Sequence, residues 1–276
     1  MAKHPAEIFG HPPDVTSAQA QDDRRKYWCP FVNQKCNKQS RLIKYPMGVC
    51  AVQYGKEIIA LSPRRFLQDN IIFKDIADHY FNSRDDLLLF SEVGLKKVGT
   101  FDYVMVKHKP MSSEIEDFVI IEFQTAQTTS TGKLVEALKD FLKYQRIDGR
   151  TYKFGLNLAD IWKRSFTQIL NKGIVFENWG HKIYWVIQEP VYQDLLARYK
   201  LQGMRYNSTH KSVFAIYDLR RVGDKHELFQ TRVESSTVDD LFKAFRHNSN
   251  VPPKDKFISN LERRLKDRME LKIQLD

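Results

Sequence analysis

Two apolar runs on either side of a polar loop form the clearest structural signal in the chain. FDYVMVK and DFVIIEFQ, within residues 101–124, are rich in β-branched and aromatic side chains, and HKPMSSEIE lies between them. Apolar runs of this kind around a Pro- and Ser-containing loop predict two strands. The loop is too short for the crossover that parallel strands require, so the pattern predicts an antiparallel hairpin.

Two acids lie symmetrically about this loop. A hairpin centred on Ser112 places Asp102 opposite Glu122, and residues opposite one another share a face. Gln124 lies on the same face, because side chains alternate along a strand. The apolar residues 119–121 predict a central strand, where a charge is costly unless it binds something. Paired carboxylate oxygens suit Mg²⁺, so the pattern predicts a metal site at the end of the hairpin.

The rest of the pattern predicts helices around further strands. Helices are expected within 73–90, which contains KDIADHYF and DDLLLF, and at 134–144, 161–170, 191–199, 237–245 and 258–273. Ser236 is the expected N-cap of the helix at 237–245. Strands are expected at 182–187, 213–217 and 228–233. This order predicts an α/β or α+β fold.

Residues 1–70 have frequent Pro and Gly and little helical periodicity, so we predict an irregular region here and a core domain over 71–276. All three cysteines lie in the first region: Cys29, Cys36 and Cys50. Clustered thiolates in a weakly patterned region suggest a structural metal site. Three cysteines are one ligand short of the usual four, and the nearby candidates are Ser62, His4 and His11. The alternative is three free, partly buried cysteines.

The charge balance narrows the class of partner. Lys and Arg number 44 against 34 Asp and Glu, giving a net charge of +10 and a pI of about 9.3. Such an excess favours a polyanion, either nucleic acid or an anionic membrane. The sequence has no apolar run of membrane-spanning length, and residues 1–5 lack the apolar core of a signal peptide. With so few cysteines, we expect reduced thiols and a cytoplasmic protein.

Several segments together resemble the NotI-like type II restriction endonucleases. These segments are AEIFG at 6–10, CPF at 29–31, Cys36 with Lys38, GVC at 48–50, FD at 101–102, IEFQT at 121–125 and IWKRSF at 161–166. Each motif is short, but their shared order makes the combination specific. The resemblance is clearest over the first 125 residues.

The resemblance implies a PD-(D/E)xK nuclease core, in which a mixed sheet is flanked by helices. In that family, acids at the positions of Asp102 and Glu122 bind the catalytic metal. Gln124 stands where the superfamily usually has its catalytic Lys, and Glu92 is similar in position to a further acid. The implied cofactor is Mg²⁺.

The cysteine segments resemble a motif that binds a structural metal, which implies Zn or Fe. The family's fourth cysteine lies in a Cys-Pro-x-Arg segment, and here that segment begins with Ser62. The site is therefore lost, weakened, or completed by Ser62, a histidine such as His11, or water.

Two functions follow from these features. The first is a Mg²⁺-dependent endonuclease that cuts double-stranded DNA at a specific site and works as a homodimer. The second is a non-catalytic, metal-stabilised DNA-binding protein. Acids at the open end of a hairpin would repel DNA phosphates unless a cation lay between them. This favours the endonuclease over the non-catalytic protein. Lys163 and Arg164, in the helix at 161–170, are candidates for DNA contact, although basic residues on a helix often form an ordinary solvated face.

Overall fold

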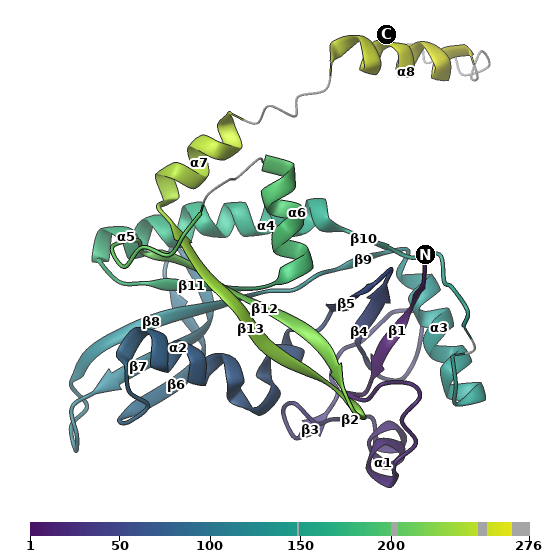
Figure 1. Cartoon of the computed structure of the whole chain (residues 1–276), viewed down its shortest axis with the longest axis horizontal. Helices are drawn as coiled ribbons and strands as arrows, with labels where there is room; N and C mark the ends of the chain where they lie inside the picture. The colour runs from purple at the N-terminus through teal and green to yellow at the C-terminus, as the bar shows by residue number, and fades with distance from the viewer. Residues whose placement is uncertain (148, 200–203, 248–252, 267–276) are drawn as a thin grey trace.

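A six-stranded mixed sheet forms the centre of the computed structural model, which describes residues 1–147, 149–199, 204–247 and 253–266 (Figure 1). In order across the sheet the strands are β13 (Lys225–Ser236), β12 (Ser212–Val222), β11 (Ile183–Gln188), β8 (Ile115–Gln124), β7 (Gly99–His108) and β6 (Leu87–Leu95). β11 runs parallel to both β8 and β12, and the other neighbours are antiparallel. The expected mixed α/β architecture is therefore confirmed.

The hairpin expected at residues 101–124 is present as β7 and β8. Tyr103 pairs with Ile121 and Lys107 with Asp117, which is the register of a hairpin centred on Ser112. A bulge beyond Lys107 shifts the register at the loop end of the hairpin. β8 lies inside the sheet between β7 and β11, as its apolar run predicts.

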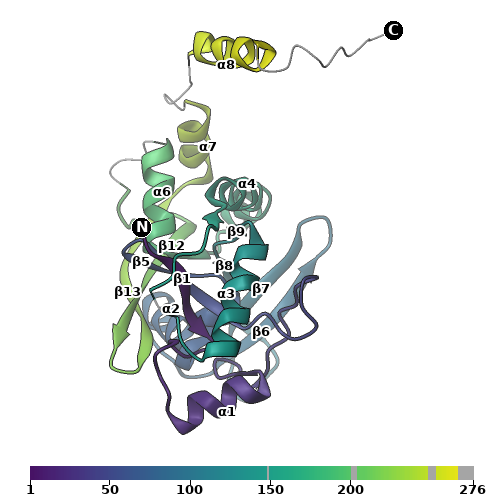
Figure 2. The ribbon, with the colours of Figure 1, turned by 90° about the vertical axis from the view of Figure 1, so that its right-hand side faces the viewer.

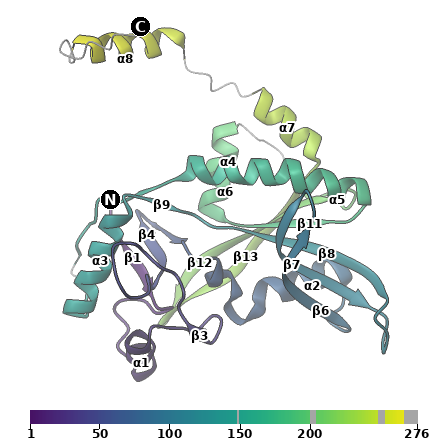
Figure 3. The ribbon, with the colours of Figure 1, turned by 180° about the vertical axis from the view of Figure 1, so that it is seen from behind.

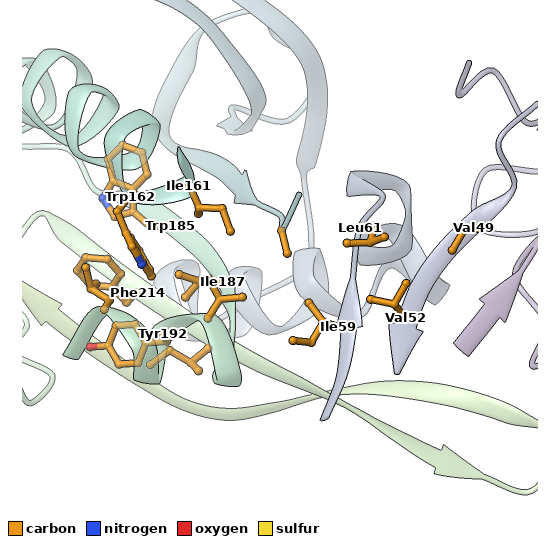
Figure 4. Packing of buried hydrophobic residues seen from close by; sticks show 14 of the residues in the cluster. Val49, Val52, Ile59, Leu61, Ile161, Trp162, Trp185, Ile187, Tyr192 and Phe214 are labelled. Atoms are coloured by element: carbon orange, nitrogen blue, oxygen red, sulfur yellow. The ribbon is translucent and has the colours of Figure 1, made fainter. Parts of the chain in front are cut away.

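Side chains alternate between the two faces of the sheet, and each face has its own hydrophobic layer. On one face the cluster includes Ile120, Trp185, Ile187 and Phe214. Figure 4 shows Trp185, Ile187 and Phe214 close to Trp162 of α4 and Tyr192 of α6. The helical segments on this side are α4 (Leu158–Gln168), η2 (Ile169–Gly173), α5 (Ile174–Trp179), α6 (Glu189–Tyr199) and α7 (Val238–Arg246).

The opposite face packs against α2 (Ile71–Phe81) and the 3₁₀ segment η1 (Pro63–Asn70). Its alternate residues include Ile121, Phe123, Tyr184 and Val186. The Tyr184 hydroxyl and Nδ1 of His79, on α2, also share a 2.6 Å hydrogen bond. Apolar packing and this polar contact together fix α2 on the sheet.

Residues 1–70 are more regular than expected. β1 (Lys3–Ile8), β4 (Val49–Tyr54) and β5 (Glu57–Ala60) form a three-stranded antiparallel sheet. The region also holds α1 (Ala18–Lys26) and the short pair β2 (Trp28–Cys29) and β3 (Gln34–Lys35). The prediction of an irregular region was wrong, because β1 pairs with a strand far along the chain and local periodicity does not report such pairing.

Two smaller predictions also need correction. DDLLLF, expected in a helix, enters the edge strand β6, and only the preceding segment forms a helix, α2. Leu has high helix propensity, but pairing with β7 overrides it. The N-cap of α7 is Thr237 rather than Ser236, since its side chain accepts the backbone N–H of Asp240.

The helices predicted at 134–144, 161–170 and 191–199 are present, whereas α1 and α5 were not predicted. α3 (Thr131–Tyr144) buries Leu134, Leu138 and Phe141, and it ends at Gln145 in the left-handed conformation. The short strand β9 (Thr128–Thr129), just before α3, pairs with β10 (Gly155–Leu156), just before α4. α8 (Lys254–Lys266) stands apart from the body in Figure 2, and the predicted helix beyond residue 266 lies outside the described residues. None of the described helices is long and apolar enough to cross a membrane.

A buried ion pair joins the N-terminal region to the main sheet. The Arg65 guanidinium is fully buried, and its Nε donates to Glu7 Oε1 at 2.9 Å. Its two other nitrogens donate to Gln68 Oε1 at 2.8 Å and to the carbonyl oxygen of His226, on β13, at 2.6 Å. Arg65 thus ties β1 and η1 to β13.

The division of the chain at residue 70 stays a prediction, and each hydrophobic cluster contains residues from both sides of it.

We expect Arg65→Met to lower the free energy of unfolding by about 3–5 kcal/mol, because it leaves the Glu7 carboxylate buried without its partner. Urea unfolding of the purified protein measures the loss. The matched control is Arg84→Met, which breaks an exposed pair with Asp78 and should cost less than about 1 kcal/mol. Equal losses in the two variants would contradict the role assigned to Arg65.

Candidate functional site

The backbone ladder between β7 and β8 ends at the pair Tyr103–Ile121, one residue short of Asp102 on β7. From there a side chain continues the contact, since Oδ2 of Asp102 accepts the backbone N–H of Phe123 at 2.8 Å. Figure 3 shows this part of the sheet, with β6, β7 and β8 close to α5. The register continues to place Asp102 opposite Glu122, at the point where the backbone pairing stops.

Glu122 is almost completely buried and forms an ion pair with a lysine from the covering helices. Its Oε1 lies 2.6 Å from the Nζ of Lys172, which is also buried and belongs to the π-helical segment η2. Nζ donates a second hydrogen bond, of 2.7 Å, to the carbonyl oxygen of Thr100. One buried ammonium therefore binds both the acid on β8 and the backbone of β7.

Burial raises the pKa of Glu122 to about 7, although the hydrogen bond from Lys172 opposes this rise. The nearby Asp102 carboxyl raises it further by repulsion. Burial also raises the pKa of Asp102, against the opposing effects of the Phe123 N–H and Lys172. Burial thus dominates the pKa of both carboxyls, and the Asp102 carboxyl lies within electrostatic reach of Glu122.

Glu92 lies on β6 between the pairs Ser91–Tyr103 and Val93–Phe101, which puts it opposite Asp102. Its φ of +54° is the left-handed conformation, which costs a non-glycine residue about 1–2 kcal/mol. Glu92 is exposed, and its charge raises the pKa of Asp102. The register thus aligns three acids across three neighbouring strands, but among the described residues they are not gathered closely enough to form a ready set of three metal ligands.

Gln124 is buried at the end of β8, and α4 holds both ends of its amide. Its Oε1 accepts the hydroxyl of Ser165 at 2.5 Å, and its Nε2 donates to Gln168 Oε1 at 2.8 Å. The amide keeps one N–H and one lone pair for other partners. Gln124 shares a face with Glu122, as expected, but much of its hydrogen bonding is directed to α4.

The two basic residues predicted on α4 lie away from this contact. Lys163 and Arg164 are exposed, whereas Ser165 on the same helix is buried toward the sheet. The guanidinium of Arg164 lies 3.4 Å from Asp160, one turn earlier. These residues form an outer helix face, and a role in DNA binding stays a prediction.

The three cysteines line one cavity of about 230 Å³, together with Ser62, Lys38 and Arg64. Of the other candidate ligands, His11 forms a 2.7 Å pair with Asp23, and the His4 ring contacts the Pro5 carbonyl oxygen at 2.9 Å. Neither histidine lines the cavity. The fold therefore brings Ser62, and not the histidines, to the cysteines.

Burial raises the pKa of the Cys29 and Cys50 thiols, and backbone N–H groups of Phe31 and Val32 partly oppose this at Cys29. Burial lowers the pKa of Lys38, which lies within electrostatic reach of Cys50. Across the described ranges, no group of three His, Cys, Asp or Glu side chains is close enough to form a ready ligand set. The cavity thus gathers thiols without assembling a complete site around them.

Sequence reasoning missed Lys172, Ser165 and Gln168 as parts of the acid site. Ser165 and Gln168 are ordinary polar positions on a helix, and only the tertiary contact with Gln124 reveals them. Lys172 did carry a signal, because it is the one charged residue in the apolar segment ILNKGIVF at 169–176. A lone lysine among apolar residues is costly to bury unless it has a partner.

A comparison with known protein families finds a family model that covers the acid site and the cysteines described above. The family model described as the restriction endonuclease NotI matches residues 14–230. The matched part includes the cysteines, the three acids, Gln124 and Lys172. No curated protein matches the chain. Since the match covers well over half of the sequence, the protein belongs to the NotI restriction endonuclease family.

Proposed function

We propose that this protein is a type II restriction endonuclease that hydrolyses phosphodiester bonds of double-stranded DNA, with Mg²⁺ bound by Asp102 and Glu122. The observation that carries this proposal is the pair of carboxylates where β7 and β8 part. One oxygen of each is held by the protein, by the Phe123 N–H and by Lys172. The backbone N–H of Asp102 also hydrogen-bonds the Glu122 carboxylate, and the oxygens that remain would be the ligands. The family to which the chain belongs consists of DNA-cleaving enzymes.

The donor set fits a hard divalent cation. Both ligands are carboxylate oxygens, which Mg²⁺ prefers. Both carboxyls have raised pKa values, so added positive charge would stabilise their ionised forms. Glu92 lies opposite Asp102 in the register and adds negative charge nearby, but among the described residues it does not complete a ready set of three ligands.

Bound there, Mg²⁺ would activate water for attack and stabilise charge on the phosphate. Asp102 and Glu122 would hold this ion and so set where the scissile phosphate lies. Gln124 cannot ionise, so it cannot take the proton from the attacking water. Instead it anchors the end of β8 to α4, and its remaining N–H can orient a water or a phosphate oxygen.

Assembly as a homodimer would match the two strands of the DNA, because one active site reaches one strand. The net charge of +10 favours association with the polyanion. The three free cysteines are compatible with action in the cytoplasm, beside the DNA.

The non-catalytic alternative explains the net charge but not the acids. A protein that only binds DNA gains nothing from burying Glu122, whose charge opposes phosphate binding and requires a buried lysine. We therefore favour the enzyme.

We expect Asp102→Asn and Glu122→Gln each to lower the DNA cleavage rate by about 10³-fold or more, since each removes a ligand charge for the metal. Binding of DNA in Ca²⁺ should change little. Incubation with a DNA of known sequence and Mg²⁺, followed by mapping of the cut ends, measures cleavage. Glu116→Gln, at the far end of β8, is the control and should cut at the wild-type rate. Cleavage by either active-site variant at that rate would reject the assignment.

The turn between β6 and β7 supports a further part of the proposal, namely the phosphate contacts. Lys96 and Lys97 are exposed in this turn, and neither has a carboxylate partner among the residues that the structure describes. At the opposite end of β7, by contrast, Lys107 and Lys109 are paired with Glu116 and Glu114. Lys96 and Lys97 therefore lie at the same end of β6 and β7 as Glu92 and Asp102.

Replacing both Lys96 and Lys97 with Ala should weaken DNA binding for all sequences and reduce the slope of log K against log salt by roughly 1–2, because each lost phosphate contact releases fewer counterions. Titrations at several salt concentrations give the slope. Lys107→Ala with Lys109→Ala is the matched control and should leave it unchanged. A pair of indistinguishable slopes would remove the turn from the DNA interface.

For the cysteine cavity we propose a weak structural metal site with Cys29, Cys36 and Cys50 as ligands and Ser62 at the fourth position. Thiolates suit Zn or Fe, whereas a neutral hydroxyl is a poor ligand beside them. Burial raises the pKa of Cys29 despite the backbone N–H groups of Phe31 and Val32, so a bound cation would have to displace the thiol proton.

Ser62→Cys should raise the content of bound Zn or Fe toward one ion per chain and increase the Tm, since it completes a four-thiolate set. Elemental analysis and a thermal melt check both. Ser113→Cys, in the exposed loop of the hairpin, adds a thiol elsewhere and should change neither. An unchanged metal content in Ser62→Cys would exclude the proposed fourth position.

A further inference from the structure

Lys172 has the contacts of a functional lysine rather than those of a surface charge. Its Nζ lies 2.6 Å from Glu122 Oε1 and 2.7 Å from the Thr100 carbonyl oxygen, and 5.2 Å from the centre of the Phe101 ring. Lys172 is only 5% exposed. Removing an ammonium from water costs several kcal/mol, so a fold retains such a group only where its charge is matched.

The backbone around Lys172 is shaped to deliver this side chain. η2 is a π-helical segment between α4 and α5, and such widened turns are frequent at functional sites. Gly173, the next residue, packs against α7 and β12 so closely that an added Cβ would lie 2.8 Å from Val238 and 3.3 Å from the Ser212 hydroxyl. The segment is therefore held against the sheet, with Lys172 directed to the end of β7 and β8.

β8, the strand that carries Glu122, contains no Lys or Arg. Gln124, two residues after Glu122, is neutral, and its amide is bonded to Ser165 and Gln168 of α4. Lys172 lowers the pKa of both Glu122 and Asp102, so its charge acts on both acids. It donates to Oε1 of Glu122, and the backbone N–H of Asp102 also hydrogen-bonds this carboxylate.

We propose that Lys172 is a positioning residue of the nuclease site, which supplies from a helix the positive charge that Gln124 does not supply from the strand. It fixes the Glu122 carboxylate by one oxygen and β7 by the Thr100 carbonyl, so that Glu122 and Asp102 face a common cation and phosphate. This inference rests on the proposed nuclease function.

The test compares Lys172→Met, Lys172→Arg and the control Lys182→Met. Lys182 is also buried, but its Nζ donates to the Tyr206 hydroxyl, and it contacts no carboxylate within the described part of the chain. The single-turnover cleavage rate should fall about 100-fold or more in Lys172→Met, while the Kd for DNA in Ca²⁺ stays within about threefold of wild type. Lys172→Arg keeps the charge and should recover at least about tenfold of the lost rate. Lys182→Met should cleave normally.

A folded Lys172→Met protein that cleaves within about threefold of wild type overturns the proposal. So does a Lys172→Arg protein that cleaves no faster than Lys172→Met, because a charge-independent packing role would give that result. These rates separate a positioning role from a purely structural one.

Thermal melts without metal supply a readout that does not depend on cleavage. Lys172→Met should lower the Tm by roughly 10 °C, but by less than about 3 °C when Glu122→Gln is also present, since no buried charge is then left unmatched. An equal loss of Tm with and without Glu122→Gln would contradict the proposed pairing of Lys172 with Glu122. If Lys172→Met fails to fold, the double variant and Lys172→Arg decide in the same way. If the wild type cuts no DNA, the nuclease proposal fails by itself, and the melts still decide the Lys172 contact.

Discussion

The register of β7 against its two neighbours is the constraint on which the acid site depends. Because Tyr103 pairs with both Ser91 and Ile121, the residues before it bring Asp102 level with Glu92 and Glu122. A slip of one residue on either side would turn an acid to the opposite face of the sheet. The apolar alternation of β7 and β8 opposes such a slip, because it would expose both hydrophobic layers.

Once the register is set, the covering helices complete the site. α4 holds the end of β8 through Gln124, and η2 places an ammonium on Glu122. Burial raises the pKa values of Asp102 and Glu122, and the charge of one lysine offsets this rise only in part. A site with an unbalanced pair of carboxylates, on a protein with a net charge of +10, fits the recruitment of both a divalent cation and a polyanion.

The hairpin and the position of its acids could be predicted from sequence, because both depend on a local apolar pattern around one loop. Gln124 could be placed on the correct face for the same reason. Its bonds to Ser165 and Gln168 could not, since they join segments some 40 residues apart. Lys172 joins Glu122 over 50 residues and has the same limitation.

The errors have the same physical origin. DDLLLF has residues that favour a helix, but β7 offers its edge and the segment becomes β6. The N-terminal sheet forms from strands that meet only after the chain has folded back. His11 was a reasonable metal ligand by position, and its pair with Asp23 directs it elsewhere.

The central claim is that Asp102 and Glu122 bind one divalent cation, and anomalous scattering from a crystal grown with Mn²⁺ tests it most directly. Mn²⁺ takes the same oxygen ligands as Mg²⁺ and can be located without ambiguity. The account predicts an anomalous peak within about 2.5 Å of an oxygen from each carboxylate, and its loss in Glu122→Gln. Saturating Mn²⁺ with no peak beside these two carboxylates would contradict it.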